Sequence, residues 1–360
     1  MRLESLVLEN CRCFESLSLD FGPGFNLVFG PNGAGKTTLL EAAFILSYGR
    51  SFRRGGSKAL QRNAGGPLRI VGRVRRNGGQ SSLLGLERRE LGWIARVDGR
   101  AATNLNELFL KCAVCCFEPG SHELIAGTAE LRRAFMDWGV FHVEPAFIDE
   151  WRRYSRSLKH ANLLMRKNAP LNELAPWFRA MEQAAGPLTH HRESYLHAWR
   201  GHFEQEAARL LPELGAADIA FEAGWDSERP LSQILTAQSD RDRRRGHVSR
   251  GPHRADWLPS FRALPRREQL SRGQEKLVAL AAVLAQAALY AESRGEWPIL
   301  LFDDLPSELD LPHQHCLLER LAELPAQVFI TATEPNAPLQ AFAGARVFHV
   351  EHGNFSTLAG

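Results

Sequence analysis

The sequence lacks the features that would direct a chain into or across a membrane. Its N-terminus, MRLESLVLENCRCF, carries Glu4 and Glu9 where a secretory leader has an unbroken apolar stretch, and no small-residue cleavage site follows. The longest apolar run, residues 277–289, contains Gln286 and is shorter than the roughly 20 residues that cross a bilayer. We therefore expect a cytoplasmic protein without a membrane partner.

Cysteine is scarce, with six in 360 residues. Cys112 and Cys115 have CxxC spacing, and Cys11 and Cys13 would be two further ligands for a metal, but the residues around both pairs are not those of a zinc knuckle. The residues that flank Cys112 and Cys115 are apolar, so we favour buried cysteines that act as small hydrophobic side chains. Free thiols are typical of a reducing compartment.

A strong charge imbalance, an internal repeat and a sustained heptad are also missing. The net charge is only +3, which permits nucleic acid as a partner without arguing for it. Without a heptad, the central part of the chain is expected to form a compact helical arm and not a long coiled coil.

The first third of the chain has the pattern of short strands. Apolar and polar residues alternate at 3–8, 17–21 and 25–29. A glycine-rich loop and a predicted helix at 38–46 follow. Further short strands, separated by glycine and asparagine turns, are predicted between residues 67 and 117.

The pattern changes near residue 131, where residues that favour helices become dominant. The segments predicted beyond this point are a helical region at 131–210, a charged linker or mobile loop at 239–251, a long helix from 270, a buried strand at 297–302, a helix, a strand at 327–331 and a final hairpin. A length of 360 residues suggests two domains or one domain with a large insertion. We predict a head formed by residues 1–130 and 241–360, with an inserted arm at 131–240.

Residues 30–37, GPNGAGKT, match the phosphate-binding pattern GxxxxGK[ST]. In this pattern, backbone N–H groups surround the phosphates, Lys36 reaches the β- and γ-phosphates, and the Thr37 hydroxyl binds Mg²⁺. The predicted strand before the loop and the helix after it supply the context that the pattern needs. We expect ATP and Mg²⁺ as ligands, with nucleotide contacts from Gly30, Pro31, Asn32, Gly33, Ala34, Gly35, Lys36, Thr37 and Thr38.

Residues 298–304, PILLFDD, form an apolar strand that ends in two carboxylates. The carboxyl end of a buried parallel strand opens at the ligand crevice of the sheet. Asp303 is placed to hold Mg²⁺ through water, as the second metal residue beside Thr37, and Asp304 to orient or deprotonate the attacking water. Lys36, Asp303 and Asp304 are the predicted catalytic residues. Ordinary acidic residues at a helix start are the alternative.

A second anion-binding feature lies far downstream, at LSRGQ (270–274). Ser271 and Gln274 have capping-box spacing, and Gly273 lets another backbone approach the start of the helix. Because the P-loop already supplies one phosphate site, these three residues are predicted to contact a nucleotide held by a second copy of the chain. Two copies would then form a homodimer around ATP. Taken alone, the segment is a plain capped helix start.

The order of GPNGAGKT, LSRGQ, ILLFDDLPSELD and VFITATE resembles that of ABC-type ATPase heads, and is most similar to the RecF family of bacterial recombination-repair proteins. The likeness covers essentially the whole chain. It implies an α/β, ABC-type P-loop ATPase head (SMC-like) with an inserted, mostly helical arm domain. Further stretches that carry it are ENCRCF (9–14), SFR (51–53), RRAFMDW (132–138), GPHRAD (251–256) and DDLPSELD (303–310).

The resemblance also implies residue roles and an activity. Residues 307–310 match the D-loop, Thr333 stands at the switch position, and Arg12 resembles an arginine that packs on the base of the nucleotide. The implied activity is ATP-dependent dimerisation on DNA with weak, DNA-stimulated ATP hydrolysis. The implied partners are RecO and RecR, which would cooperate in loading RecA at gaps and in the SOS response.

The sequence departs from the wider ABC pattern in three places. Asp304 replaces the usual glutamate, and Thr333 replaces the usual histidine, so we expect slow turnover and a switch more than a motor. A Q-loop glutamine is not assigned, because Gln61 comes too early and residues 116–119 contain none.

A basic stripe is predicted on one face of the helix within 131–210. Arg152, Arg156, Lys159 and Arg166 fall within about 80° of one another around the helix, opposite an apolar stripe. Such a stripe is suited to a nucleic acid backbone, whether single-stranded, gapped or duplex, without sequence specificity. Residues 241–245 and 50–62 are further candidates, and a solvated arm face is the alternative.

Two other functions are compatible with an ABC-type head. The first is the ATPase subunit of a membrane transporter, which the helical insertion, Thr333 and the paired aspartates disfavour. The second is a structural SMC-like protein, which the missing coiled coil disfavours.

Overall fold

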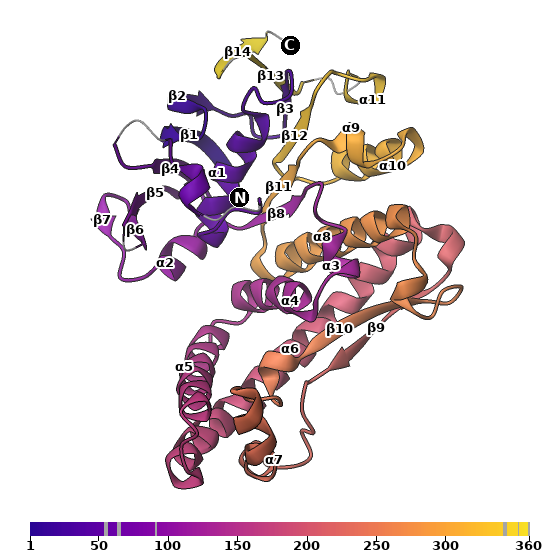
Figure 1. Cartoon of the computed structure of the whole chain (residues 1–360). Coiled ribbons are helices and arrows are strands. Elements are labelled where there is room, and N and C mark those ends of the chain that lie inside the picture. Colours follow the sequence, from indigo (N-terminus) through magenta and orange to yellow (C-terminus); the bar gives the residue numbers. More distant parts are fainter. Residues whose placement is uncertain (54–56, 63–65, 91, 341–343, 352, 359–360) are drawn as a thin grey trace. The chain divides into compact units, whose positions relative to one another are not determined.

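The computed structural model describes residues 1–53, 57–62, 66–90, 92–340, 344–351 and 353–358, and Figure 1 shows the chain as a ribbon. The chain divides into two compact units. Unit 1 consists of Met1–Ser121 and Ala279–Gly360, and unit 2 is the continuous segment His122–Val278. Composition predicted boundaries at 130/131 and 240/241, whereas residues 122–130 and 241–278 pack in unit 2 with the helical arm.

Unit 1 contains a mostly parallel sheet with the strand order β14-β13-β3-β12-β11-β8. Three inner strands, β3, β12 and β11, and the edge strand β8 are almost entirely buried and apolar, as expected for strands covered on both faces. The predicted strands and final hairpin are confirmed. The bounds are β3 Phe25–Phe29, β8 Val114–Phe117, β11 Ile299–Phe302, β12 Val328–Ala332, β13 Arg346–Glu351 and β14 Asn354–Leu358.

A second sheet of unit 1 is antiparallel throughout, with the order β2-β1-β4-β5-β6-β7. In β4, Ile70 and Val74 are buried while Arg69 and Arg73 are exposed, so this strand has one core face and one solvent face. The bounds are β1 Arg2–Cys11, β2 Phe14–Asp20, β4 Arg69–Arg75, β5 Ser81–Arg89, β6 Gly92–Val97 and β7 Arg100–Ala101.

Helix α1 (Lys36–Tyr48) follows the glycine loop and contacts strands of both sheets. It begins after Gly35 and ends at Gly49, and both glycines have the left-handed conformation in which side chains are strained. The other helices of unit 1 are η1 Ser57–Leu60, α2 Leu105–Phe109, α9 Leu305–Glu308, α10 Leu311–Ala322 and α11 Ala337–Gln340.

Unit 2 is mainly helical and is built along α6, a helix of 40 residues that accommodates Pro176 and Pro187 in its interior. Its core includes the edge-to-face pair Trp199 and Trp257, whose ring centroids are 5.1 Å apart. The bounds are α3 Glu123–Ala126, α4 Ala129–Val143, α5 Phe147–Arg166, α6 Leu171–Leu210, η2 Pro212–Leu214, β9 Ala217–Glu222, α7 Leu231–Arg245, η3 Pro252–Arg254, β10 Asp256–Phe261 and η4 Arg267–Gln269. Strands β9 and β10 form an antiparallel pair.

The expected linker at 239–251 is wrong for its first half, which belongs to helix α7. The buried side chains Leu231, Ile234, Leu235, Ser239 and Asp242 recur at helical spacing along one face. The charged run hides this pattern in the sequence because its last buried member is an aspartate. The Asp242 carboxylate accepts a hydrogen bond from the Ser249 backbone N–H at 3.0 Å.

Helix α8 (Arg272–Arg294) begins in unit 2 and continues into unit 1. Among the described residues it is the helix with the length and hydropathy to cross a bilayer, but 78% of its most apolar 18-residue stretch is buried in the protein. Burial of this kind is typical of a core helix.

Candidate functional site

The candidate site lies where several parallel strands of unit 1 end. The register pairs Phe302 of β11 with Phe117 of β8 on one side and with Ile330 of β12 on the other. The residues that follow Phe117 and Phe302 are Glu118 and Asp303, and Thr331 follows Ile330. Strand β3, on the far side of β12, leads directly into the glycine loop.

The loop requires glycine at Gly30 and Gly35, whose φ angles are 154° and 118°. A Cβ atom on Gly30 would lie 2.0 Å from the Val350 carbonyl oxygen, and one on Gly35 would lie 2.3 Å from the Phe14 ring. Both approaches are impossible for a side chain, so the loop conformation depends on these two residues. At Gly33 a Cβ atom would meet nothing within 4 Å.

Lys36, the first residue of α1, points back over the loop. Its ammonium group donates hydrogen bonds to the carbonyl oxygens of Gly30 at 2.6 Å and Pro31 at 3.1 Å. Burial lowers the pKa of Lys36, and the nearby charges of Asp304 and Asp303 act in the opposite direction. Lys36 therefore places a positive charge next to the backbone of the glycine loop, where a phosphate group can approach it.

Asp303 is buried at the end of β11 and is held by two hydroxyl groups. The Thr37 and Thr331 side chains donate hydrogen bonds to its Oδ1 at 3.0 and 2.7 Å. Burial raises the pKa of Asp303, while these two hydrogen bonds lower it. Because hydroxyl and carboxylate oxygens are the ligands that Mg²⁺ prefers, the predicted pair Thr37 and Asp303 fits such an ion.

Thr331 is a site residue that no sequence motif indicates. Its hydroxyl donates to Asp303 and accepts from the backbone N–H of Asp304 at 2.8 Å, so one side chain positions both carboxylate residues. Asp304 itself has a φ of 50° and caps α9. A threonine inside the apolar stretch VFITA was the available signal, since a buried hydroxyl needs hydrogen-bond partners.

A cavity of about 340 Å³ joins these groups. Arg53, Glu118 and Pro119 line it although none of them is among the predicted nucleotide residues, and Glu118 lies in the segment that lacks a Q-loop glutamine. Of the predicted nucleotide residues, Gly30, Pro31, Ala34 and Arg12 are not part of the lining. The lining residues are Asn32, Gly33, Gly35, Lys36, Thr37, Thr38, Phe52, Arg53, Glu118, Pro119, Asp303, Asp304 and Thr331.

Arg12 is tied to helix α1. Its guanidinium makes two hydrogen bonds to the fully buried carboxylate of Glu41, at 2.5 and 2.7 Å, and the Ser51 hydroxyl donates to the same carboxylate. This hydrogen-bonded ion pair raises the pKa of Arg12. Contact between Arg12 and the base of a nucleotide stays a prediction.

Thr333, at the predicted switch position, lies close to the glycine loop. Its hydroxyl donates to the Asn32 side-chain oxygen at 3.4 Å. In the predicted D-loop segment, Asp310 caps α10 by accepting from the His313 backbone N–H at 3.0 Å. These contacts give both segments a structural role within unit 1.

Ser271, Gly273 and Gln274 belong to unit 2 at the start of α8, and the predicted capping box is confirmed. The Gln274 side chain accepts from the Ser271 N–H at 2.9 Å, and the Ser271 hydroxyl accepts from the Gln274 N–H at 3.3 Å. A Cβ atom on Gly273 would have only the Ser271 hydroxyl oxygen nearby, at 4.0 Å. Ser271 and Gly273 are exposed, so an approaching group can reach this side of the helix start.

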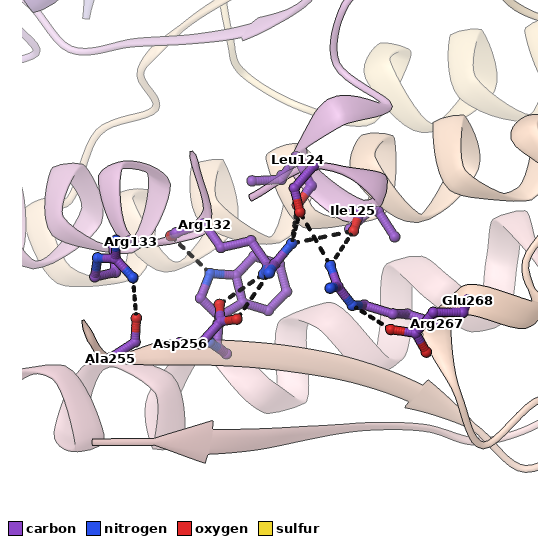
Figure 2. A network of polar contacts seen from close by, with 10 residues as sticks. Leu124, Ile125, Arg132, Arg133, Ala255, Asp256, Arg267 and Glu268 are labelled. Atoms are coloured by element: carbon purple, nitrogen blue, oxygen red, sulfur yellow. Dashed lines mark hydrogen bonds and ion pairs between the residues drawn. The ribbon is translucent and has the colours of Figure 1, made fainter. Parts of the chain in front are cut away.

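Two of the family-like stretches, 132–138 and 251–256, meet in the interior of unit 2 (Figure 2). The Arg132 guanidinium makes two hydrogen bonds to the Asp256 carboxylate, at 2.7 and 2.8 Å. The Trp257 ring N–H donates to the Arg132 carbonyl oxygen, and Arg133 donates to that of Ala255. These stretches therefore hold the arm together instead of forming a reactive centre.

The same network extends toward the start of α8. Arg132 and Arg267 both donate to the carbonyl oxygens of Ile125 and Gly127, at the end of α3 (Figure 2). Carbonyl groups at the end of a helix have no partner within the helix, so these arginines satisfy them. Arg267 stands four residues before Ser271.

The basic stripe on α5 has the predicted orientation. Arg156, Lys159 and Arg166 are exposed and Arg152 is half-buried, while Tyr154, Ala161 and Met165 on the opposite side are buried. Arg152 pairs with Asp149 at 3.6 Å. DNA contact by this face stays a prediction.

Cys112 and Cys115 are buried, and Cys116 is half-buried. Burial raises the pKa of Cys112 to about 12 and that of Cys115 further, so both thiols stay protonated. Cys13 is exposed. In the predicted loop at 50–62, residues 54–56 lie outside the described residues.

A P-loop between a parallel strand and a helix, with a carboxylate pair that follows another strand of the same sheet, defines an ABC-type P-loop ATPase head with an inserted arm. The model of the family described as RecF/RecN/SMC N terminal domain matches residues 2–356. The chain belongs to this family and, within it, to the RecF proteins.

The curated relatives named "DNA replication and repair protein RecF" match along their whole length. The one from Stenotrophomonas maltophilia (strain R551-3) is 44% identical, with 98% of each chain covered. The one from Xanthomonas euvesicatoria pv. vesicatoria (strain 85-10) is 43% identical, with 100% of this chain and 99% of the relative covered.

Solved structures share the fold. That of "the recombination mediator protein RecF-ATP in RecFOR pathway" has a TM-score of 0.89 at 24% identity, covering 99% of this chain and 97% of that one. An Smc head bound to the C-winged helix domain of ScpA has a TM-score of 0.58 at 15% identity, covering 99% and 96%. The family assignment does not favour the transporter alternative.

Proposed function

We propose that this protein is an ATP-dependent DNA-binding switch of recombinational DNA repair and replication-fork maintenance, acting in the cytoplasm. The observation that carries the proposal is the convergence of Lys36, Thr37, Asp303 and Asp304 on one cavity in a chain that belongs among the RecF proteins. A relative's fold has been solved with ATP, and the cavity here has the cation and the N–H-rich loop that a triphosphate needs.

Nucleotide binding would use the loop and Lys36 for the phosphates. Thr37 and Asp303 would hold Mg²⁺, which neutralises phosphate charge when bound. Asp304 would orient or deprotonate the attacking water, in a position fixed by its backbone bond to Thr331. A carboxylate on a short side chain, with Thr333 and no imidazole beside it, supports slow hydrolysis.

ATP would also join two copies of the chain. At the start of α8 the Ser271 and Gln274 N–H groups are bonded within the capping box, so the exposed Ser271 side chain, the Gly273 backbone and the positive end of the helix dipole would face the nucleotide of a second copy. Hydrolysis would release the two copies, so the dimer is the state that binds DNA.

The relatives' names connect them to replication and repair, and the solved structure of the recombination mediator protein RecF-ATP in RecFOR pathway supports RecO and RecR as partners. For this chain we infer binding to single-stranded, gapped or duplex DNA without sequence specificity, through the α5 face. The expected outcome is RecA loading at gaps and a contribution to the SOS response.

The test measures fluorescence anisotropy of labelled single-stranded, duplex and gapped DNA with ATP, ADP or no nucleotide. Binding that tightens with ATP supports the switch. Absence of DNA binding with every nucleotide would contradict the proposal and return the transporter subunit as the leading alternative.

Ser271→Arg is the matched variant for the dimer. It should still bind ATP as a monomer, because the P-loop is unchanged, yet it should not dimerise. Light scattering with ATP reports the molecular mass. A Ser271→Arg variant that dimerises as well as the unaltered chain would remove the helix start from the interface.

A further inference from the structure

A cluster of basic side chains lies where the ends of α5 and α7 come together in unit 2. Arg241, Arg244 and Arg245 are exposed on the last turns of α7, and Arg166 and Lys167 are exposed at the end of α5. The two helices pack against each other (Figure 1). We call these five residues the arm-end cluster.

The ends of the two helices that carry the cluster are in direct contact at Gly246. A Cβ atom built on Gly246, the residue that ends α7, would lie 3.1 Å from Cγ of Arg166. The stem of Arg166 therefore runs across Gly246, which brings its guanidinium to the same end of the arm as Arg244 and Arg245. The left-handed backbone of Gly246 permits this close approach.

The segment after α7 is fixed to α5 and cannot be treated as a linker. The Val248 N–H donates to the Asn162 side chain at 2.8 Å, and the Ser249 N–H donates to buried Asp242 at 3.0 Å. The Val248 carbonyl oxygen lies 3.0 Å from Nε2 of His253. These bonds hold the cluster on a preformed surface, so a ligand need not order it.

The cluster is not neutralised from within the protein. Residues 239–250 contain five arginines and two aspartates. Asp242 is buried, and Asp240 is paired with Arg243 at 2.8 Å. In the part of the chain that the structure describes, no ion pair is recorded for any of the five cluster residues.

A cavity of about 620 Å³ opens beside the cluster, lined by Asn168, Asp240, Arg243 and Arg244. The four lining residues are all polar or charged. The segments 160–168 and 239–250 contain no Phe, Tyr or Trp on which a base would stack. The chemistry available here is that of charge and hydrogen-bond donors, and it matches phosphate groups.

We propose that the arm-end cluster extends the basic face of α5 into one continuous surface that binds the phosphate backbone of nucleic acid. The proposal rests on the DNA-binding function proposed above. From Arg156 to Arg166 the α5 face is about 15 Å long, which corresponds to roughly four nucleotides of one DNA strand. Arg166 connects this face to Arg244 and Arg245. The sequence predicted the α5 face and gave residues 241–245 as a separate candidate, whereas the structure brings the two together at the ends of α5 and α7.

The test compares the full-length chain with Arg244→Gln/Arg245→Gln in anisotropy titrations of a labelled duplex across a series of salt concentrations. Each phosphate contact adds about 0.9 to the slope of log affinity against log salt. The double variant should bind on the order of tenfold more weakly, with a slope shallower by about 2. Binding of a fluorescent ATP analogue should be unchanged.

Arg229→Gln is the matched control. Arg229 is also exposed, and no ion pair is found for it in the described part of the chain. It lies two residues before the N-terminal end of α7, whereas the cluster is at the C-terminal end. The Arg229→Gln variant should leave the slope of log affinity against log salt unchanged. A second variant on the other helix, Arg166→Gln/Lys167→Gln, should reproduce the loss and keeps the test decisive if the first variant unfolds.

Three outcomes separate the hypotheses. If neither double variant differs in slope from Arg229→Gln while the unaltered chain binds DNA, the cluster proposal is wrong and the general function stands. If the unaltered chain binds no DNA, the general function fails first. If the variants lose binding to poly-L-glutamate but keep their DNA affinity, the cluster serves an acidic protein, which also overturns the proposal.

Discussion

The cavity of unit 1 and the arginine network of unit 2 use the same kinds of charged residue for opposite purposes. In the cavity, Lys36 bonds to two carbonyl oxygens and Asp303 to two hydroxyl groups, and no ion pair is recorded for either among the described residues. In the network, Arg132 is 1% exposed and forms a two-bond ion pair with Asp256 as well as bonds to carbonyl groups.

The difference shows how to separate a binding site from a structural ion pair. A buried charge paired inside the protein has its electrostatic demand met, and removing its partner is costly. A charge held only by neutral dipoles is stabilised weakly and gains most from a charged ligand. Both the cavity and the arginine network contain stretches that resemble the RecF family, so only the hydrogen bonds and ion pairs of their charged residues distinguish them.

The largest expected effect is on binding in the cavity. Lys36→Ala should lose measurable ATP binding, because the cation over the loop is gone, while the free energy of unfolding changes by no more than about 1 kcal/mol. Titration with a fluorescent ATP analogue and urea unfolding measure the two quantities. Loss of folding together with binding would show that Lys36 is structural and would break the contrast.

Arg132→Met should have the opposite profile. It leaves the Asp256 carboxylate buried without its partner, so the free energy of unfolding should fall by about 3 to 5 kcal/mol. Six of the eight tryptophans lie between residues 122 and 278, so tryptophan fluorescence during denaturation reports mainly on unit 2. Arg132→Met/Asp256→Leu should recover part of the loss. A loss below about 1 kcal/mol for the single variant would argue against a structural role.

The stability of unit 2 should depend on pH through His253, a half-buried group that is held by neutral partners and, among the described residues, by no ion pair. Nε2 of His253 donates to the Val248 carbonyl oxygen and Nδ1 accepts from the Tyr154 hydroxyl, and burial lowers the pKa of His253 from 6.5 to about 4. Between these values the unfolded chain binds a proton that the folded chain does not, so stability falls as the pH decreases. The contribution is about 3 kcal/mol across this window.

His253→Gln should remove that contribution. The difference in free energy of unfolding between pH 6.5 and pH 4 should be smaller in the variant than in the unaltered chain. Carboxylates add slopes of the same sign to both proteins, so only the difference between the two is informative. Parallel pH profiles would show that His253 does not titrate as its burial implies.

The smallest effect is expected at Thr331. Thr331→Val keeps the shape of the side chain but removes the hydroxyl that holds Asp303 and the Asp304 backbone, so kcat for ATP hydrolysis should fall about tenfold. KM for ATP should stay nearly constant, since the loop and Lys36 are unchanged. Thr331→Ser should restore the rate. A change in KM alone would assign Thr331 to nucleotide binding instead.

The sequence predicted the glycine loop, the strand and helix that flank it and the carboxylate pair because each depends on local pattern. Apolar strands such as β11 are recognisable by composition, and the Ser271–Gln274 capping box depends on residues three apart. The role of Thr331 was not predicted because its partners are 28 and 27 residues away in the chain. Helix α7 was missed because a buried aspartate stands where the pattern requires an apolar residue.

The sequence by itself determined the class of head and the family, and it predicted the residues that would surround a phosphate, because these follow from short motifs and their order. Only the tertiary structure decided which charges are satisfied within the protein. Arg132 pairs with Asp256, 124 residues away, Arg12 pairs with Glu41, and the arm-end arginines have no recorded ion pair in the described residues. Ion pairing depends on distances of a few ångströms between segments remote in sequence, and folding alone sets those distances.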